Sequence, residues 1–122
     1  MLINLSNHPL ADWQPDQLEE AKRRFVSVVD MDFPQIDPDW DLDIVDRIAL
    51  QTAKACMDML AHSTDKSNAI HVMGELTFCF RFVRLMQQQN ISCLASTTSR
   101  QAELTPKGKL SVFTWKKFRP YF

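Results

Sequence analysis

Glycine is scarce in this chain, which has only Gly74 and Gly108 among its 122 residues. Motifs that bind dinucleotides or nucleoside triphosphates need several glycines at fixed spacing, because the backbone must approach the phosphates closely. Neither a GxGxxG nor a P-loop pattern is present, and a GxSxG nucleophile turn is also missing. The composition therefore argues against a dinucleotide-binding domain, a P-loop NTPase and an α/β-hydrolase.

Cysteine pairs with metal-binding or redox spacing are absent as well. Cys56, Cys79 and Cys93 are odd in number and far apart, and none belongs to a CxxC pair. Each lies in an apolar segment, which favours a small buried side chain over a nucleophile. The sequence shows no signal peptide and no apolar stretch long enough to span a membrane. We therefore expect a reduced, cytoplasmic protein without a membrane partner.

Neither sign of charge is in excess, since the formal net charge of the chain is −1. This balance argues against a protein that coats DNA and against a disordered tail. The charges are unevenly placed, however: residues 30–46 hold seven acidic residues and no basic one, and the last sixteen residues hold five basic residues and no acidic one. Two solvated faces are the plainer interpretation of this asymmetry.

The length suits a single domain covering residues 1–122. Apolar segments that predict strands alternate with segments of helical spacing, an order typical of parallel strands joined by right-handed crossovers. A TPKGK turn and an alternating segment then predict a last, antiparallel strand. We expect an α/β fold, a three-layer Rossmann-like domain with a mainly parallel sheet and a C-terminal antiparallel strand. The predicted strands are residues 1–5, 25–30, 68–74, 91–97 and 110–115, and the predicted helices are residues 16–24, 38–62 and 75–90.

Polar residues follow three of the four predicted parallel strands. Ligands of open parallel sheets bind outside the carboxyl ends of the strands, so we expect these residues to converge on one crevice. Helix N–H groups, hydroxyls and a bidentate guanidinium suit a phosphate or phosphodiester, although the hydroxyl run alone is equally typical of a turn. The residues are Ser6, Asn7 and His8 after the first strand, Gly74, Glu75 and Thr77 after the third, and Ser96, Thr97, Thr98, Ser99 and Arg100 after the fourth.

Other chemistries have weaker signals. His8, His62 and His71 lack the spacing of zinc ligands. His71 lies in the middle of a predicted strand, where a hydrogen-bonded core histidine is the commoner role. Asp30 and Asp32 can hold magnesium, but acids at such positions more often cap or solvate a turn. We expect no metal and no cofactor.

The order of motifs resembles a group of small CRISPR-associated proteins of type III systems; the motifs are LINLSNHP, VVDMDFPQIDP, HVMGELTF, CLASTTSR and VFTWKKFRPYF. Proteins of this group have a Rossmann-like fold related to sensor domains that bind cyclic oligoadenylates. Several are ring nucleases, which linearise the cyclic messenger and switch off the antiviral response. The resemblance implies a homodimer that binds the ring across its two-fold axis, over the carboxyl ends of the strands. An aromatic C-terminal segment also favours a homodimer.

The resemblance further implies metal-independent cleavage, in which a ribose 2′-hydroxyl attacks its own phosphate. Such chemistry needs alignment and charge stabilisation more than a strong base. Arg100 is the expected stabiliser of the phosphorane charge, His8 the acid or base, and Thr98 or Thr97 the group that orients the phosphate. The other expected ligand contacts are Ser6, Asn7, Gly74, Glu75, Thr77, Phe78, Ser96, Thr97 and Ser99.

Two alternatives stay open. A binding module can sequester or sense the cyclic nucleotide without cutting it, and the sequence barely separates binding from cleavage. A nucleoside or sugar-phosphate transferase on a similar fold would use Glu75 as its nucleophile, although a glutamate at a helix start more often interacts with the helix dipole. Cyclic tetra-adenylate is the first expectation for the ligand. Adenine specificity does not follow from the sequence, because a ring stacked on Phe78 or Trp13 can be any base.

Overall fold

A five-stranded sheet with the order β2–β1–β3–β4–β5 forms the centre of the computed structural model, which describes residues 1–122. The first four strands are parallel, and β5 runs antiparallel to β4. The strands are β1 (Leu2–Ser6), β2 (Val28–Asp32), β3 (Ala69–Met73), β4 (Ser92–Thr105) and β5 (Gly108–Pro120), and the helices are α1 (Pro15–Arg24), α2 (Leu42–Ala61) and α3 (Leu76–Gln88).

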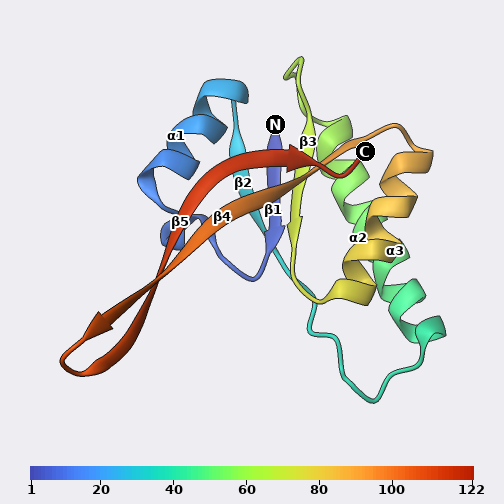
Figure 1. The fold of residues 1–122 in the computed structure, drawn as a ribbon. Helices are drawn as coiled ribbons and strands as arrows, with labels where there is room; N and C mark the ends of the chain where they lie inside the picture. Colours follow the sequence, from blue (N-terminus) through green and yellow to red (C-terminus); the bar gives the residue numbers. More distant parts are fainter.

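Helix α1 covers one face of the sheet, and α2 and α3 cover the other (Figure 1). A short 3-10 helix, Leu10–Asp12, precedes α1. The architecture is the three-layer Rossmann-like fold that the sequence predicts, with a mainly parallel sheet and an antiparallel C-terminal strand. None of the helices combines the length and the apolar character needed to cross a membrane.

The face under α2 and α3 is apolar. Because side chains alternate along a strand, Ile3 and Leu5 of β1 point to this face, as do Ile70 and Val72 of β3. Small residues of α2 and large residues of α3 complete a continuous core; they include Ala49, Ala53, Cys56, Phe78, Phe82 and Met86. All three cysteines are buried and unpaired, as the apolar segments around them predict.

The face under α1 carries a second, smaller core around Leu2, Ala69 and Leu94. Trp13 and Phe25, which flank α1, pack on it, and so do two aromatic residues of β5. Those two residues, Trp115 and Phe118, are three positions apart and yet lie in the same core, because the register between β4 and β5 shifts there. This face also buries four polar side chains, namely Asn4, Ser6, Gln17 and His71.

The starts of α2 and β2 differ from the sequence prediction, and β5 continues to Pro120, five residues beyond the predicted end of the last strand. Helix α2 begins at Leu42 and not at Pro38, because the Asp37 carboxylate accepts a hydrogen bond from the N–H of Asp39 (2.8 Å) and closes a turn instead. Strand β2 begins at Val28, because the N–H of Phe25 still bonds to Ala21 O (2.9 Å) at the end of α1.

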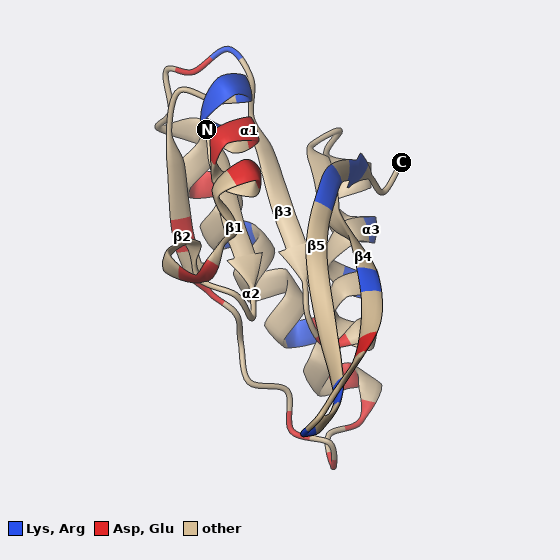
Figure 2. Cartoon of the chain, turned by 60° about the vertical axis from the view of Figure 1, so that its left-hand side comes forward, with Lys and Arg blue, Asp and Glu red and all other residues tan.

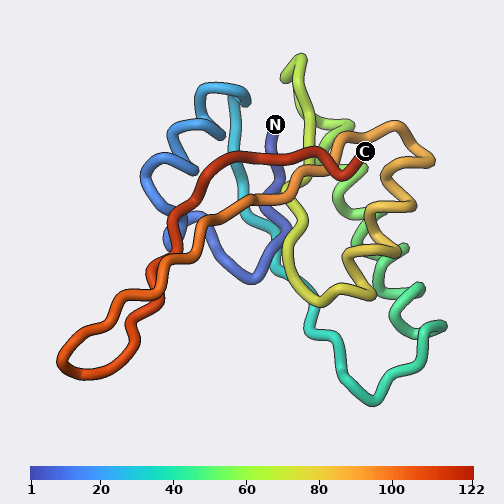
Figure 3. The backbone as a smooth tube through the Cα atoms, in the orientation of Figure 1, coloured from blue at the N-terminus to red at the C-terminus, as the bar shows by residue number.

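The largest correction concerns β4. The sequence predicts a strand that ends near Thr97, whereas β4 continues through the hydroxyl run to Thr105 and pairs with β5 along its whole length. Residues 99–114 form a two-stranded arm that extends beyond the three layers (Figures 1 and 3). Every side chain of the β4 half of this arm is at least partly exposed, so residues 99–105 have no apolar alternation to reveal a strand. The predicted TPKGK turn is present, with Gly108 at a φ of 118°.

Candidate ligand-binding site

The strand order reverses between β1 and β3, because β1 connects to β2 on one side and the chain then returns to place β3 on the other. Sheets of this kind bind ligands at that reversal, outside the carboxyl ends of the strands. The ends of β1 and β3 are joined there by a hydrogen bond from Asn7 N to Met73 O (3.2 Å). Two pockets lie beside this edge, and six of the predicted site residues line one or the other.

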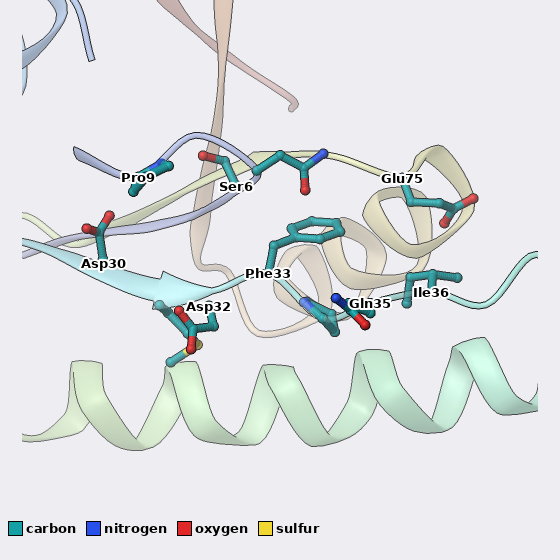
Figure 4. A pocket seen from close by; sticks show the side chains of 11 residues that line it. Ser6, Pro9, Asp30, Asp32, Phe33, Gln35, Ile36 and Glu75 are labelled. Atoms are coloured by element: carbon teal, nitrogen blue, oxygen red, sulfur yellow. The ribbon is translucent and has the colours of Figure 1, made fainter. Parts of the chain in front are cut away.

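The first pocket, here called the acidic pocket, has a volume of about 780 Å³ and lies beyond the end of β2. In Figure 4 the ring of Phe33 lies among its side chains, above helix α2. Ser6 and Asn7 line it together with three acidic residues, Asp30, Asp32 and Glu75, and no lysine or arginine. Carboxylates without a cation repel a phosphate, so this pocket does not suit the predicted anion.

The start of α3 binds a carboxylate of its own chain. Glu75 accepts hydrogen bonds from the N–H groups of Thr77 (3.1 Å) and Phe78 (2.7 Å), and the hydroxyl of Thr77 also donates to it. These bonds, that of Phe78 first, hold the pKa of Glu75 below its ordinary value. The N–H groups that the sequence assigned to a phosphate therefore already have an anionic partner.

Two other predicted contacts near this helix have structural roles. Phe78 is fully buried between Phe33 and Phe82, at centroid distances of 5.0 and 5.8 Å, so its prediction as a ligand contact is wrong for this structure. A side chain at Gly74 would lie 2.3 Å from the ring of Phe33. Glycine is required there by the close approach of that ring.

The second pocket, here called the α1-face pocket, has a volume of about 490 Å³. It brings together three predicted site residues, His8 from the loop after β1 and Ser96 and Thr98 from β4. Sequence reasoning did not assign most of its other walls to a site, because these residues come from segment 12–17, from β3 and from β5 and lie outside the polar runs that follow the predicted strands. The missed residues are Asp12, Gln14, Gln17, Met73, Phe113 and Trp115; Trp13 was considered only as a ring on which any base can stack, and His71 was expected only as a core residue.

Because side chains alternate along β4, the hydroxyl groups that follow Cys93 face two opposite sides of the strand. Ser96 and Thr98 face the α1-face pocket, whereas Thr97 and Ser99 face the opposite side of β4. The Thr97 hydroxyl donates to Lys117 O (3.2 Å). Arg100 lies farther out on the arm, where it donates to Ser111 Oγ (3.1 Å).

Arg100 is adjacent to the pocket without lining it. Its guanidinium carbon lies 5.5 Å from the centroid of the Phe113 ring, and Phe113 is a wall of the pocket. This contact is a cation–π interaction, which holds the guanidinium beside the pocket. The guanidinium remains exposed and has N–H groups available for an anion at the pocket rim.

A chain of hydrogen bonds crosses the sheet on this face. Asn4 Nδ2 donates to Asp30 Oδ1 (2.9 Å) and to His8 O (2.8 Å). Asn4 Oδ1 lies 2.9 Å from His71 Nδ1, and His71 Nε2 lies 2.7 Å from Ser96 Oγ. The chain thus links side chains of β2, β1, β3 and β4 in that order. No buried side-chain nitrogen or oxygen of the protein lacks a hydrogen-bond partner.

His71 is held neutral within this chain. Burial lowers the pKa of His71 to about 4, and the neighbouring His8 adds to this effect. The indole ring of Trp13 packs edge-on against the imidazole, with centroids 5.1 Å apart. A buried, neutral His71 is a weak base, so His8 is the histidine of the pocket that is placed to exchange protons with a ligand.

Comparison with known proteins gave one match. The model described as the Uncharacterized protein MJ1673 family matches residues 1–119, which include all three helices and both pockets. No curated protein and no solved structure matches the chain.

Proposed function

The chain belongs to the MJ1673 family, and we propose that it is a ring nuclease, which binds a cyclic oligoadenylate and linearises it. The observation that carries this proposal is the convergence of His8, Ser96 and Thr98 on one pocket beside the strand-order reversal. The resemblance of the sequence motifs to small proteins of type III CRISPR systems supports the kind of ligand. Cyclic tetra-adenylate is the first candidate.

The walls of the α1-face pocket suit a nucleotide. Phe113 is 54% exposed and lines the pocket, so one face of its ring is open to a base. Hydroxyl and amide groups of Thr98 and Gln17 lie on the same pocket and can bond to a base or a phosphate. Arg100, beside Phe113, places a positive charge at the rim.

The proposed reaction needs only groups of the ligand and of the chain. The ribose 2′-hydroxyl attacks the adjacent phosphorus, a new 2′-O–P bond forms, and the bond to the 5′-oxygen breaks. One proton leaves the 2′-oxygen and one reaches the departing 5′-oxygen; His8 serves one of these transfers and solvent the other. Arg100 stabilises the charge of the phosphorane, and Thr98 orients the phosphate. The products carry a 2′,3′-cyclic phosphate and a 5′-hydroxyl.

Binding without cleavage is the second candidate, and one observation favours it. The Ser96 hydroxyl has its full set of hydrogen bonds, to His71, Gln17 and Trp115, and His71 is held neutral by burial. Of the titratable side chains in the pocket, only His8 and Asp12 remain for proton transfer, and this suits a sensor or sequestering module as well as a slow nuclease. The transferase alternative gains no such support, because the Glu75 carboxylate bonds to its own helix.

We further propose that the protein is a homodimer and that the arm contributes to the interface. A two-stranded hairpin is marginally stable alone in water, yet the arm exposes Leu104, Leu110 and Phe113. Figure 2 colours basic residues along β5 and acidic residues in the β2–α2 connection, and Figure 1 shows the arm and this connection apart, so two copies can pair these charges. Light scattering at tens of micromolar should give a dimer mass. A monomer mass would contradict the proposal.

Incubation with cyclic tetra- and hexa-adenylate, with and without EDTA, tests the activity directly. We expect linear products whose formation EDTA does not slow, because hydroxyls, His8 and Arg100 carry the proposed chemistry. Thr98→Val should slow cleavage roughly tenfold by removing a hydrogen bond to the phosphate, while Thr64→Val, in the exposed α2–β3 loop, should leave the rate unchanged. Cleavage that EDTA abolishes and magnesium restores would move the site to Asp30 and Asp32. Binding without any product would favour the sensor.

A further inference from the structure

Gln17 is the one polar side chain of α1 that is buried and also lines the α1-face pocket. It is only 8% exposed, and its Nε2 donates to Ser96 Oγ (3.1 Å). Its Oε1 accepts no hydrogen bond from the chain, yet no fully buried side-chain oxygen of the protein lacks a partner. This oxygen is therefore accessible, and the space it faces is the pocket that Gln17 lines.

The direction of the hydrogen bonds across the sheet decides how the Gln17 amide is turned. The Asp30 carboxylate and the carbonyl of His8 only accept hydrogen bonds, so the Asn4 atom between them must be the Nδ2 donor. The other amide atom, Oδ1, then faces His71 Nδ1. An oxygen at this place requires that Nδ1 carries the proton of the neutral imidazole.

The same logic continues from His71 to Gln17. With its proton on Nδ1, His71 can only accept at Nε2, so the Ser96 hydroxyl donates its single proton to that atom. Ser96 Oγ has two remaining acceptor positions, and the indole N–H of Trp115 takes one of them (3.1 Å). The atom of Gln17 that faces Ser96 must then be a donor as well, which leaves Oε1 directed to the pocket.

We propose that Gln17 Oε1 determines the specificity of the pocket by accepting a hydrogen bond from the exocyclic amine of a planar ring. The ring would lie beside Phe113 and Trp115, the aromatic walls of the same pocket. This inference rests on the proposed function, which identifies the ligand as a nucleotide. It adds a basis for selecting an amine-bearing base such as adenine, which the sequence did not determine. Asp30, Asn4, His71 and Ser96 act as positioning residues, because they fix the orientation of the amide without contacting the ring.

Calorimetric binding of two matched rings tests the inference. The probes are cyclic tetra-adenylate and the cyclic tetranucleotide of purine riboside, in which hydrogen replaces each exocyclic amine. The natural protein should bind the first ring at least about tenfold more tightly, the effect of one well-made hydrogen bond. Gln17→Leu should remove this preference, and Gln51→Leu, at an exposed position of α2, should retain it.

The variant Ser96→Ala keeps the Gln17 amide in the pocket and removes the hydroxyl that fixes its orientation. Without the hydroxyl, nothing holds the Gln17 amide in one direction, so it can turn its NH₂ to the pocket. We expect the variant to gain affinity for the corresponding cyclic tetra-inosinate, whose ring carries a carbonyl oxygen in place of the amine, relative to cyclic tetra-adenylate. Thermal melting of each variant shows whether it is folded.

The outcomes distinguish this inference from the proposed function. If cyclic tetra-adenylate binds but the amine has no effect, or if Gln17→Leu keeps the full preference, the role of Gln17 is refuted and the proposed function stands. If no ring binds, the same comparison is made with AMP and purine riboside 5′-monophosphate. A preference for AMP that depends on Gln17 would support the inference and refute the cyclic ligand, and absence of binding by either mononucleotide would overturn both.

Discussion

The two faces of the sheet are built from the same strands and have opposite chemistry. Ile3 and Leu5 point from β1 into the core under α2 and α3, while Asn4 and Ser6, the residues between and after them, point to α1. On β3, Ile70 and Val72 flank His71 in the same way. One face is dry and continuous, and the other combines a small apolar core with a chain of hydrogen bonds.

This difference separates stability from recognition. The α2–α3 face stabilises the fold by burying apolar surface, and its buried core side chains are all apolar or cysteine. The α1 face buries polar groups without leaving any of them unpaired, because each has a hydrogen-bond partner. At its edge this face opens into the α1-face pocket. Mutations on the two faces should therefore have different consequences, and four predictions test this contrast.

The largest expected effect is a loss of stability on the dry face. Phe82 is fully buried beside Phe78, so Phe82→Ala should lower the free energy of unfolding by about 3–5 kcal/mol through the cavity it leaves. Urea denaturation measures this loss, and the ligand preference of the folded fraction should not change. A loss below about 1 kcal/mol would show that the α2–α3 core repacks easily, and it would weaken the contrast.

The second prediction concerns the polar face at acid pH. The pKa of His71 falls from 6.5 to about 4 on folding, so the unfolded chain takes up a proton there that the folded protein refuses. The associated stability, about 3 kcal/mol, is fully present above pH 6.5 and is lost as the pH falls towards 4.

Urea denaturation between pH 7 and 4 should show this loss in the natural protein and a flatter profile in His71→Gln, which does not titrate. His62→Gln is the control, because His62 is exposed and lies outside the network. Parallel profiles for the natural protein and His71→Gln would rule out the burial of a neutral imidazole.

The third prediction concerns turnover at the edge of the polar face. If Arg100 stabilises charge that develops only in the transition state, Arg100→Ala should lower turnover about a hundredfold or more, which corresponds to about 2.7 kcal/mol, and weaken binding less. Arg84→Ala is a matched control, since its guanidinium also lies over an exposed phenylalanine, Phe80 (5.7 Å), but on the α3 side. Single-turnover kinetics with cyclic tetra-adenylate gives both the rate constant of cleavage and the dissociation constant of the ring.

Two other results would change the role of Arg100. Equal losses of affinity and of rate at low substrate, with the saturated single-turnover rate preserved, would make Arg100 an anchor of the ring. If the turnover and the affinity of Arg100→Ala both stay within a factor of about two or three of the natural protein, and the melting temperature is unchanged, Arg100 is a solvated residue of the arm.

The smallest expected effect tests whether the dry face rejects a polar group. Val72→Thr places a hydroxyl in the core under α2 and α3, where apolar neighbours offer it little hydrogen bonding, and should cost about 1–3 kcal/mol. Val26→Thr, at a position that is 87% exposed, should be nearly neutral. Equal effects of the two substitutions on urea denaturation would contradict the division between the faces.

Much of the fold could be predicted from the sequence because it depends on local periodicity. The helical spacing that ends near His62 and the apolar segment around Ile70 describe α2 and β3 nearly as they occur. The sequence misjudged β4, because a strand that is solvent-exposed on both faces has no alternation of apolar and polar residues. A run of serine and threonine is then indistinguishable from a turn.

The candidate site could be predicted only in part. His8 and Thr98 follow or extend strands whose carboxyl ends must meet at one edge of a parallel sheet, so topology alone brings them together. The contacts of Glu75 and Phe78 inside the protein could not be predicted, because the sequence does not show that a side chain caps its own helix or that a ring enters the core. Gln17 belongs to none of the motifs, and Trp115 belongs to the aromatic C-terminal segment, which favoured a homodimer; the sequence assigned neither residue to the pocket.

The sequence by itself determined the α/β class and the order of elements of this protein, since both follow from the spacing of apolar residues along one segment of chain at a time. Only the tertiary structure decided which polar groups meet. Asp30, Asn4, His71, Ser96 and Gln17 belong to four strands and a helix, and the direction of each hydrogen bond depends on the one before it. Whether a hydroxyl, an amide or an imidazole donates or accepts at a given atom depends on the partner of that atom. These partners are brought together by the pairing of strands that lie far apart in the chain.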